Sequence, residues 1–212
     1  FASKDEDDRF MTKEEVDRMI AVRDEMERKR AEMEKEFKNT LKEYKEYKNL
    51  INALESNNED SGIRFISEAN TETFLSYPDL YKRSRHILYN FQQKGALPGD
   101  EIVFQIQDNE TFISIFWACL MGQLIPIPIS VGNNDEHRLK LIKVWQVLNN
   151  PWLISDSDLL SRLEKYAYEK GFGEVLKLIK ARILLIKEVL IEVKEGRLAN
   201  PGRDDIAYIQ FS

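Results

Sequence analysis

The sequence is poor in the residues that form disulfides and metal centres. Its 212 residues include one cysteine, Cys119, and two histidines, His86 and His137. A single cysteine excludes an internal disulfide and a zinc site built from several cysteines. Neither histidine has another histidine or a cysteine at a metal-ligand spacing, so we expect no metal site. We predict that both histidines are partly buried and hydrogen-bonded, and that Cys119 is an inert core residue.

Long apolar runs are also absent. No stretch approaches the ~20 apolar residues that a membrane helix needs, and no apolar signal segment opens the chain. We therefore expect a cytoplasmic protein without a membrane span. The net charge of −6 argues against a nucleic-acid binder that works through a basic surface. The first residue is Phe1 rather than Met, which predicts a piece of a longer protein.

Glycine and proline are missing from residues 1–60, where 31 of the 60 residues are charged. Residues 61–212 hold all nine glycines and all six prolines. This contrast predicts a charged helical region with a linker over 1–60, followed by a folded domain over 61–212. Thr12 and Glu15 form a capping box, and nothing after them breaks a helix before about residue 54.

An apolar stripe with a mean step close to 3.6 residues follows one face of this predicted helix. Such a face needs a partner surface, because an isolated helix is only marginally stable. A spacer, antiparallel packing on the rest of the chain, self-association and docking on another protein through residues 12–55 all remain open. We predict that the association face consists of Met26, Met33, Phe37, Leu41 and Tyr44.

After residue 62 the pattern alternates between strands and helices. Residues 63–66 and 73–75 predict a hairpin, and Ser76 with Asp79 then caps a helix that ends at Gly95. Further strands are predicted at 102–106, 124–129, 151–154, within 182–189, and at 206–211. Helices are predicted at 109–121 with Asn109 as its cap, at 135–148, at 158–170 and near 175–179. The fold class is therefore α/β, a parallel sheet with helices on both faces, preceded by a long N-terminal helix.

Motifs that grip nucleotides are not found at the predicted carboxyl ends of the strands. The first parallel strand is followed by Gln107 and Asp108 rather than by a Gly-x-Gly-x-x-Gly turn, and no Gly-Lys-Ser/Thr loop occurs. Trp117, Trp145 and Trp152 lie on predicted core faces. The residues themselves therefore indicate no catalytic group and no metal site.

Four segments nevertheless resemble, in the right order, the N-terminal subdomain of the adenylate-forming (acyl-AMP-forming) ligases. Residues 73–80 resemble that family's L-T-Y-x-E-L junction, and residues 95–103 resemble its G-V-x-P-G-D-x-V segment. Residues 116–128 are similar to F-x-G-C-L-x-A-G-x-x-x-V-P. Residues 204–212 look like the strand that leads into the T-S-G-S-T-G-x-P-K-G phosphate loop, with Ser212 at its first hydroxyl position.

Within that family, the stretch from Pro126 to Ile129 and the closing residues 207–212 resemble the fatty acyl-AMP ligase branch. The resemblance implies an enzyme that uses ATP and Mg²⁺ to activate a fatty acid as an acyl-adenylate. It then passes the acyl group to the thiol of an acyl carrier protein or to CoA. The phosphate loop and lysine of that reaction would follow Ser212, so the 212-residue chain is expected to be an inactive scaffold.

Two alternatives to this interpretation stay open. One is an acyl-CoA ligase or an amino-acid-activating enzyme of the same family. The other is a non-catalytic interaction module that docks through the long helix.

Overall fold

A computed structural model describes residues 11–43, 47–67, 70–132, 134–202 and 204–211, with side chains described only as far as residue 38 in the first range. The chain divides into two compact units between residues 46 and 47. This division falls earlier in the chain than the residue-60 boundary suggested by composition. The two units are described separately below.

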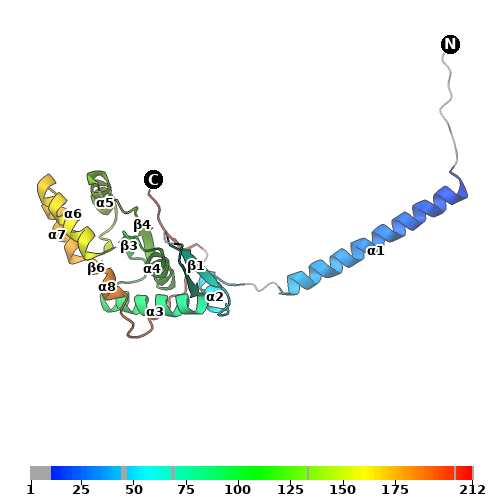
Figure 1. Cartoon of the computed structure of the whole chain (residues 1–212), viewed down its shortest axis with the longest axis horizontal. Helices are drawn as coiled ribbons and strands as arrows, with labels where there is room; N and C mark the ends of the chain where they lie inside the picture. Colours follow the sequence, from blue (N-terminus) through cyan, green and yellow to red (C-terminus); the bar gives the residue numbers. More distant parts are fainter. Residues whose placement is uncertain (1–10, 44–46, 68–69, 133, 203, 212) are drawn as a thin grey trace, which may run out of the picture. The chain divides into compact units, whose positions relative to one another are not determined.

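The first unit contains the helix α1, Lys13–Glu43 (Figure 1). Its predicted capping box is confirmed: Thr12 Oγ1 accepts the Glu15 N–H at 3.3 Å, and the Glu15 carboxylate accepts the Thr12 N–H at 2.8 Å. The Thr12 hydroxyl also donates to the Glu15 carboxylate at 3.0 Å, and the two hydrogen bonds from the Thr12 N–H and hydroxyl lower the pKa of Glu15. Among the described residues, no helix is both long enough and apolar enough to cross a membrane.

The prediction of one continuous helix to residue 54 is wrong. A separate short helix, α2 (Leu50–Glu55), begins at Asn49, whose side chain accepts the Asn52 N–H at 3.0 Å. Ile51 and Leu54 of α2 are buried in the core of the second unit. Asparagine is a good N-cap, so Asn49 allows the chain to begin a new helix without a glycine or proline.

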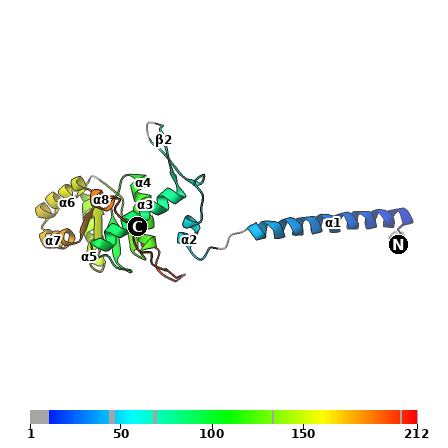
Figure 2. The same cartoon turned by 90° about the horizontal axis from the view of Figure 1, so that it is seen from below.

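The hairpin is confirmed as β1 (Gly62–Ile66) paired antiparallel with β2 (Glu72–Ser76). Figure 2 shows this hairpin projecting from the α/β body. The helix α3 (Tyr77–Gln93) follows directly, and its capping box is also confirmed: Ser76 Oγ accepts the Asp79 N–H at 3.2 Å. A tight turn follows α3, in which Gly99 has a φ of 89° and the Asp100 N–H donates to Leu97 C=O at 3.0 Å.

The predicted parallel sheet is confirmed, with four strands in the order β4-β3-β5-β6. The register pairs Val103 of β3 with Ile127 of β4 on one side and with Leu153 of β5 on the other. Four helices connect these strands along the chain: α4 (Asn109–Met121), α5 (Asp135–Val147), α6 (Ser157–Lys170) and α7 (Gly173–Ala181). The strands themselves are β3 (Glu101–Phe104), β4 (Ile125–Pro128), β5 (Trp152–Ser155) and β6 (Ile183–Leu185), and α8 (Ile186–Val189) follows β6.

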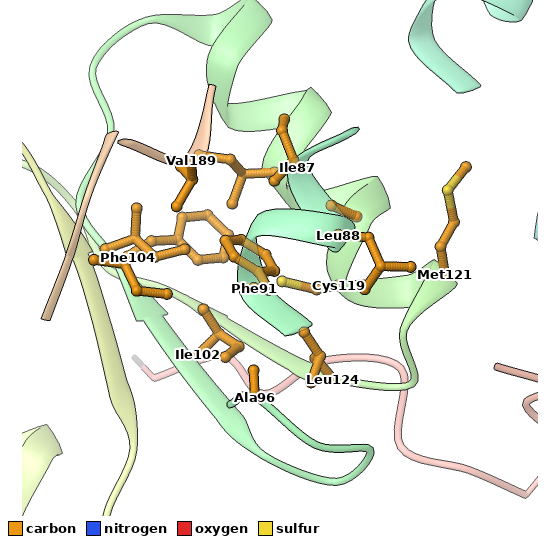
Figure 3. Close-up of a cluster of buried hydrophobic side chains, with 14 of the residues drawn as sticks. Ile87, Leu88, Phe91, Ala96, Ile102, Phe104, Cys119, Met121, Leu124 and Val189 are labelled. Carbon is orange, nitrogen blue, oxygen red and sulfur yellow. The ribbon is translucent and has the colours of Figure 1, made fainter. Parts of the chain in front are cut away.

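Alternate residues of the strands point to opposite faces of the sheet, and each face has its own core. Ile102 and Phe104 of β3 pack with α3 and α4, whereas Val103 packs with α5 and α6. Figure 1 shows α3 on one side of the sheet, with α5, α6 and α7 on the other. Figure 3 shows the first core, where Phe91 of α3 lies beside Phe104 of β3 and Cys119 of α4. Helices on both faces are thus confirmed.

Candidate functional site at the carboxyl edge of the sheet

The carboxyl ends of the four strands meet at one edge of the sheet, where ligands bind in folds of this class. The loop after β3 begins with Gln105, which is buried and whose N–H donates to Ile154 C=O at 3.2 Å. The loops after β4 and β5 reach the same edge and lead into α5 and α6. The N-termini of α4, α5 and α6 therefore lie together there.

Each of these helix N-termini is already occupied by a side chain of this chain. Asp108 accepts the Thr111 N–H at 2.7 Å, Asn134 accepts the His137 N–H at 3.0 Å, and Asp156 accepts the Leu159 N–H at 2.8 Å. The predicted cap of α4, Asn109, is wrong, since Asp108 fills that position. Acidic side chains also occupy the first turns: Glu110, Asp135, Glu136 and Asp158.

Helix N-termini bind phosphate when their N–H groups are free. Here each cap side chain uses one or two of those donors, and the neighbouring carboxylates repel an anion. Hydrogen bonds from Thr111 keep the pKa of Asp108 below its usual range, so this cap stays ionised at neutral pH. The described residues at the carboxyl edge therefore do not form a phosphate site for ATP.

A pocket of about 390 Å³ opens at the ends of β3 and β4. Its polar lining comes from Asn109, Ser130, Lys140 and Gln210, and Phe112 and Phe211 contribute aromatic walls. Lys140 is the only cation among the lining residues. Sequence reasoning missed Ser130 and Lys140, although their positions just after β4 and in the first turns of α5 follow from the topology. The pocket can hold a small polar or anionic group but contains no paired nucleophile and base.

The last described segment reaches this pocket along the outer edge of β4. Ile209 N–H donates to Pro126 C=O at 3.1 Å, and the Tyr208 ring lies 6.1 Å from the Phe116 ring. Ile209 and Phe211 pack against the second core. Ser212, the predicted start of the phosphate loop, lies outside the described residues, but Gln210 and Phe211 before it line the pocket at the carboxyl edge.

The predicted final strand over 206–211 is wrong, and the reason lies in β4. In β4 the backbone N–H groups of the odd-numbered residues point toward β3. The outer edge therefore carries the backbone groups of Pro126 and Pro128. Neither proline has an N–H, and this edge can only accept hydrogen bonds. The segment is therefore held by one backbone hydrogen bond instead of a regular ladder.

The remaining reactive side chains are structural. Cys119 is fully buried, and burial raises the pKa of its thiol, in agreement with the prediction of an inert core residue. His137 Nδ1 contacts Asn134 Oδ1. The predicted hydrogen bond of His86 is wrong, since its buried Nδ1 has no partner and lies 3.8 Å from Glu192 Oε2. In the described part of the chain, no cluster of histidine, cysteine, aspartate and glutamate is suited to a metal ion.

The opposite, amino edge of the sheet carries a cluster that sequence reasoning missed. Asp100 Oδ2 accepts the Trp152 Nε1–H at 2.9 Å and lies 3.4 Å from Arg182 Nη2. The Arg182 guanidinium also stacks 4.0 Å over the Trp152 ring. The cluster joins β3, β5 and the start of β6, so it fastens the sheet and lies away from the carboxyl edge.

The predicted association face is described only in part. Met26, Met33 and Phe37 lie on α1 with exposed fractions of 67%, 63% and 65%. Leu41 belongs to α1, but its side chain is outside the described set, and Tyr44 lies outside the described residues. These exposed side chains are available to a partner.

Comparisons with known proteins identify the fold that carries this site. No protein-family model matches the chain. A structure of McyG A-PCP complexed with phenylalanyl-adenylate aligns with a TM-score of 0.63 and 31% identity, over 73% of this chain and 24% of that one. The adenylation domain of a keto acid-selecting NRPS module, bound to keto acyl adenylate, aligns with a TM-score of 0.65 and 21% identity over 76% of this chain and 29% of that chain.

Fatty acyl-adenylate ligases from E. coli and L. pneumophila give a TM-score of 0.58 and 19% identity over 77% of this chain. The alignment covers 29% of the ligase chain. The present chain thus spans between a quarter and a third of the length of the proteins it resembles.

Proposed function

Because the chain has the fold of part of an adenylate-forming ligase, we propose that it is the N-terminal scaffold of an enzyme that activates a carboxylic acid. The carboxylate attacks the α-phosphate of ATP, pyrophosphate leaves, and an acyl-adenylate forms. The observation that carries this proposal is the alignment with the phenylalanyl-adenylate complex at 31% identity over 73% of the chain.

The role proposed for this chain is to carry residues 206–211 along β4 to the carboxyl edge. Pro126 C=O holds the Ile209 N–H, and Phe116 packs beside Tyr208. The described residues do not fit the phosphates of ATP, because each helix N-terminus at the edge is capped. We therefore propose that ATP and Mg²⁺ are held by residues outside the described set, beginning with Ser212.

A fatty acid is the proposed substrate class. The proposal is supported by the stretch from Pro126 to Ile129 and by the likeness to fatty acyl-adenylate ligases in fold. A second candidate is a substrate with an aromatic or α-keto group, which is favoured by the higher identity to the phenylalanyl-adenylate complex. An acid panel separates the two.

The proposed acceptor is the thiol of a carrier protein, with CoA as the alternative. Support comes from the A-PCP protein among the similar structures. We expect a phosphopantetheine-bearing carrier protein to be acylated faster than free CoA.

ATP–pyrophosphate exchange tests the activity. We expect no exchange from the 212-residue chain, because loss of even one donor to developing charge costs about 10²–10³ in rate. A longer protein that continues past Ser212 should exchange pyrophosphate with decanoate and Mg²⁺ and show less exchange with phenylalanine or phenylpyruvate. Exchange by the 212-residue chain would refute the scaffold role. An inactive longer protein would favour the interaction module.

For the interaction role of α1, we propose that Met26, Met33 and Phe37 form the centre of an association face. Met33→Glu should lower the mass measured by light scattering, or release a bound partner. Lys35→Glu is the matched control, because Lys35 lies on the opposite side of the helix and receives the same new side chain. Equal effects of the two substitutions, or a monomer in every case without a partner, would reject the face.

A further inference from the structure

A second pocket lies at the other end of β4 from the carboxyl edge. It has a volume of about 280 Å³ and is lined by residues 48–51, by Leu120, Gln123 and Leu124, and by residues 201, 202 and 205–207. We name it the α2 pocket because α2 forms one wall. Aliphatic side chains make up most of its surface: Leu50, Ile51, Leu120, Leu124 and Ile206.

None of the described residues that line the α2 pocket is aromatic. Two of the aliphatic side chains, Leu50 and Ile206, are 63% and 60% exposed. Covering such side chains removes apolar surface from water, which is favourable by roughly 25 cal/mol per Å². A narrow aliphatic occupant fits these walls better than a planar ring does.

The polar groups around the pocket differ in whether they already have a hydrogen-bond or ion-pair partner. The Asn49 side chain caps α2. Asp205 Oδ2 accepts from Gln123 Nε2 at 2.9 Å and from the Gly202 N–H at 2.7 Å. Lys48 makes no ion pair with any described residue. Hydrogen bonds do not cancel the charge of Asp205, so the described lining carries one anion and one cation, and Lys48 is the group that can pair with a carboxylate.

We propose that the α2 pocket binds a linear aliphatic monocarboxylate, with its chain along the aliphatic walls and its carboxylate at Lys48. This inference is independent of the proposed ligase activity, since every residue it uses lies within the present chain. The occupant would contact Ile206 and Ala207, and the chain continues from them to Gln210 and Phe211 at the carboxyl edge. A ligand bound at the amino end of β4 would thus contact the segment that leads to the carboxyl end of β4.

Calorimetric titration of the 212-residue chain with hexanoate, octanoate and decanoate tests the pocket. Affinity should rise about threefold to fourfold for each added methylene until the pocket is full. Decanoate should bind more tightly than decan-1-ol, and decan-1-ol more tightly than decylammonium. A tighter complex with decylammonium would overturn the role of Lys48, and no saturable binding of any probe would overturn the site.

Three variants locate the binding. Ile206→Glu should weaken decanoate at least tenfold, because it puts a carboxylate into the aliphatic wall. Ile191→Glu is the control, since Ile191 is 55% exposed but does not line the pocket. Lys48→Glu should weaken decanoate about fivefold and leave decan-1-ol nearly unchanged. Because all three side chains are exposed, these variants should fold, which circular dichroism checks. Equal affinities for the Ile206→Glu and Ile191→Glu proteins would refute the assignment.

Discussion

Helices α1 and α4 show two ways in which this chain stabilises a helix. The 31-residue α1 has no buried side chain over its described positions, whereas the 13-residue α4 has six buried residues. Local features support α1, namely the Thr12 capping box and ion pairs such as Glu25 with Arg28 at 2.8 Å. Burial against the sheet supports α4. Sequence periodicity alone does not distinguish these cases, because both helices carry many apolar residues.

The largest expected difference in the free energy of unfolding comes from making the same phenylalanine-to-alanine substitution in each region. Phe91→Ala removes a fully buried ring from the first core and should lower the free energy of unfolding by about 3–5 kcal/mol. Phe37→Ala removes a ring that is 65% exposed on α1 and should change it by less than about 0.5 kcal/mol. Urea unfolding followed by tryptophan fluorescence measures both, since all three tryptophans lie after residue 47. Similar losses would show that α1 is part of the same cooperative core.

A second pair of variants sharpens the boundary between the regions. Leu54→Ala should destabilise the α/β unit by about 2–5 kcal/mol, because Leu54 is 3% exposed. Leu50→Ala, on the same short helix but 63% exposed, should cost far less. A protein of residues 47–212 should therefore unfold cooperatively, whereas one of residues 61–212 should have lost several kcal/mol. Equal stability of the two truncated proteins would return the boundary to residue 60.

Local signals made much of the fold predictable. Ser76 with Asp79 and Thr12 with Glu15 each act through neighbours within three residues, and both predictions are confirmed. The alternation of strands and helices after residue 62 likewise predicted the parallel sheet.

Most of the errors concern interactions between distant residues; the cap of α4 is the exception, since Asp108 and Asn109 are neighbours. Residues 206–211 have the composition of a strand, but their neighbour in space is the acceptor-only edge that contains Pro126. Ile51 continues the stripe of α1 in sequence, yet the break before Asn49 moves it into another core. At the site, the position of Lys140 in the pocket depends on how α5 follows β4, which no local pattern reveals. The missing hydrogen bond of His86 could not be predicted either, because the group that lies near its Nδ1, the Glu192 carboxylate, is distant in sequence.

A smaller effect is expected at the start of α4. Asp108→Ala should cost about 1 kcal/mol at pH 7, whereas Asn109→Ala should cost a few tenths, because Asp108 provides the cap. The pKa of Asp108 is lowered on folding, so its contribution is fully present above the unfolded value of about 3.9. It is lost as the pH falls through the lower folded pKa. Unfolding measured from pH 7 to pH 3 should show the difference between wild type and Asp108→Ala shrinking below about pH 4.

The smallest expected effect tests the local support of α1. Glu25 lies 2.8 Å from Arg28 and 3.6 Å from Lys29, at spacings of three and four residues. In a peptide of residues 11–43, Glu25→Gln should lower helix stability by a few tenths of a kcal/mol for each pair, measured by circular dichroism at low salt. Glu32→Gln is the matched control, because Glu32 makes no ion pair with the described residues and its substitution changes the net charge equally.

The difference between these two peptides should disappear in 1 M NaCl, where the Debye length falls to about 3 Å. Equal helicity at low salt would mean that the ion pairs contribute nothing. The stability of α1 would then rest on its Thr12 cap and on the helix propensity of its many glutamates, lysines and arginines. A difference that persists in salt would point instead to packing of the Glu25 side chain along the helix. Only a loss of the difference in salt supports charge pairing as part of the local support of α1, which buries no side chain over its described positions.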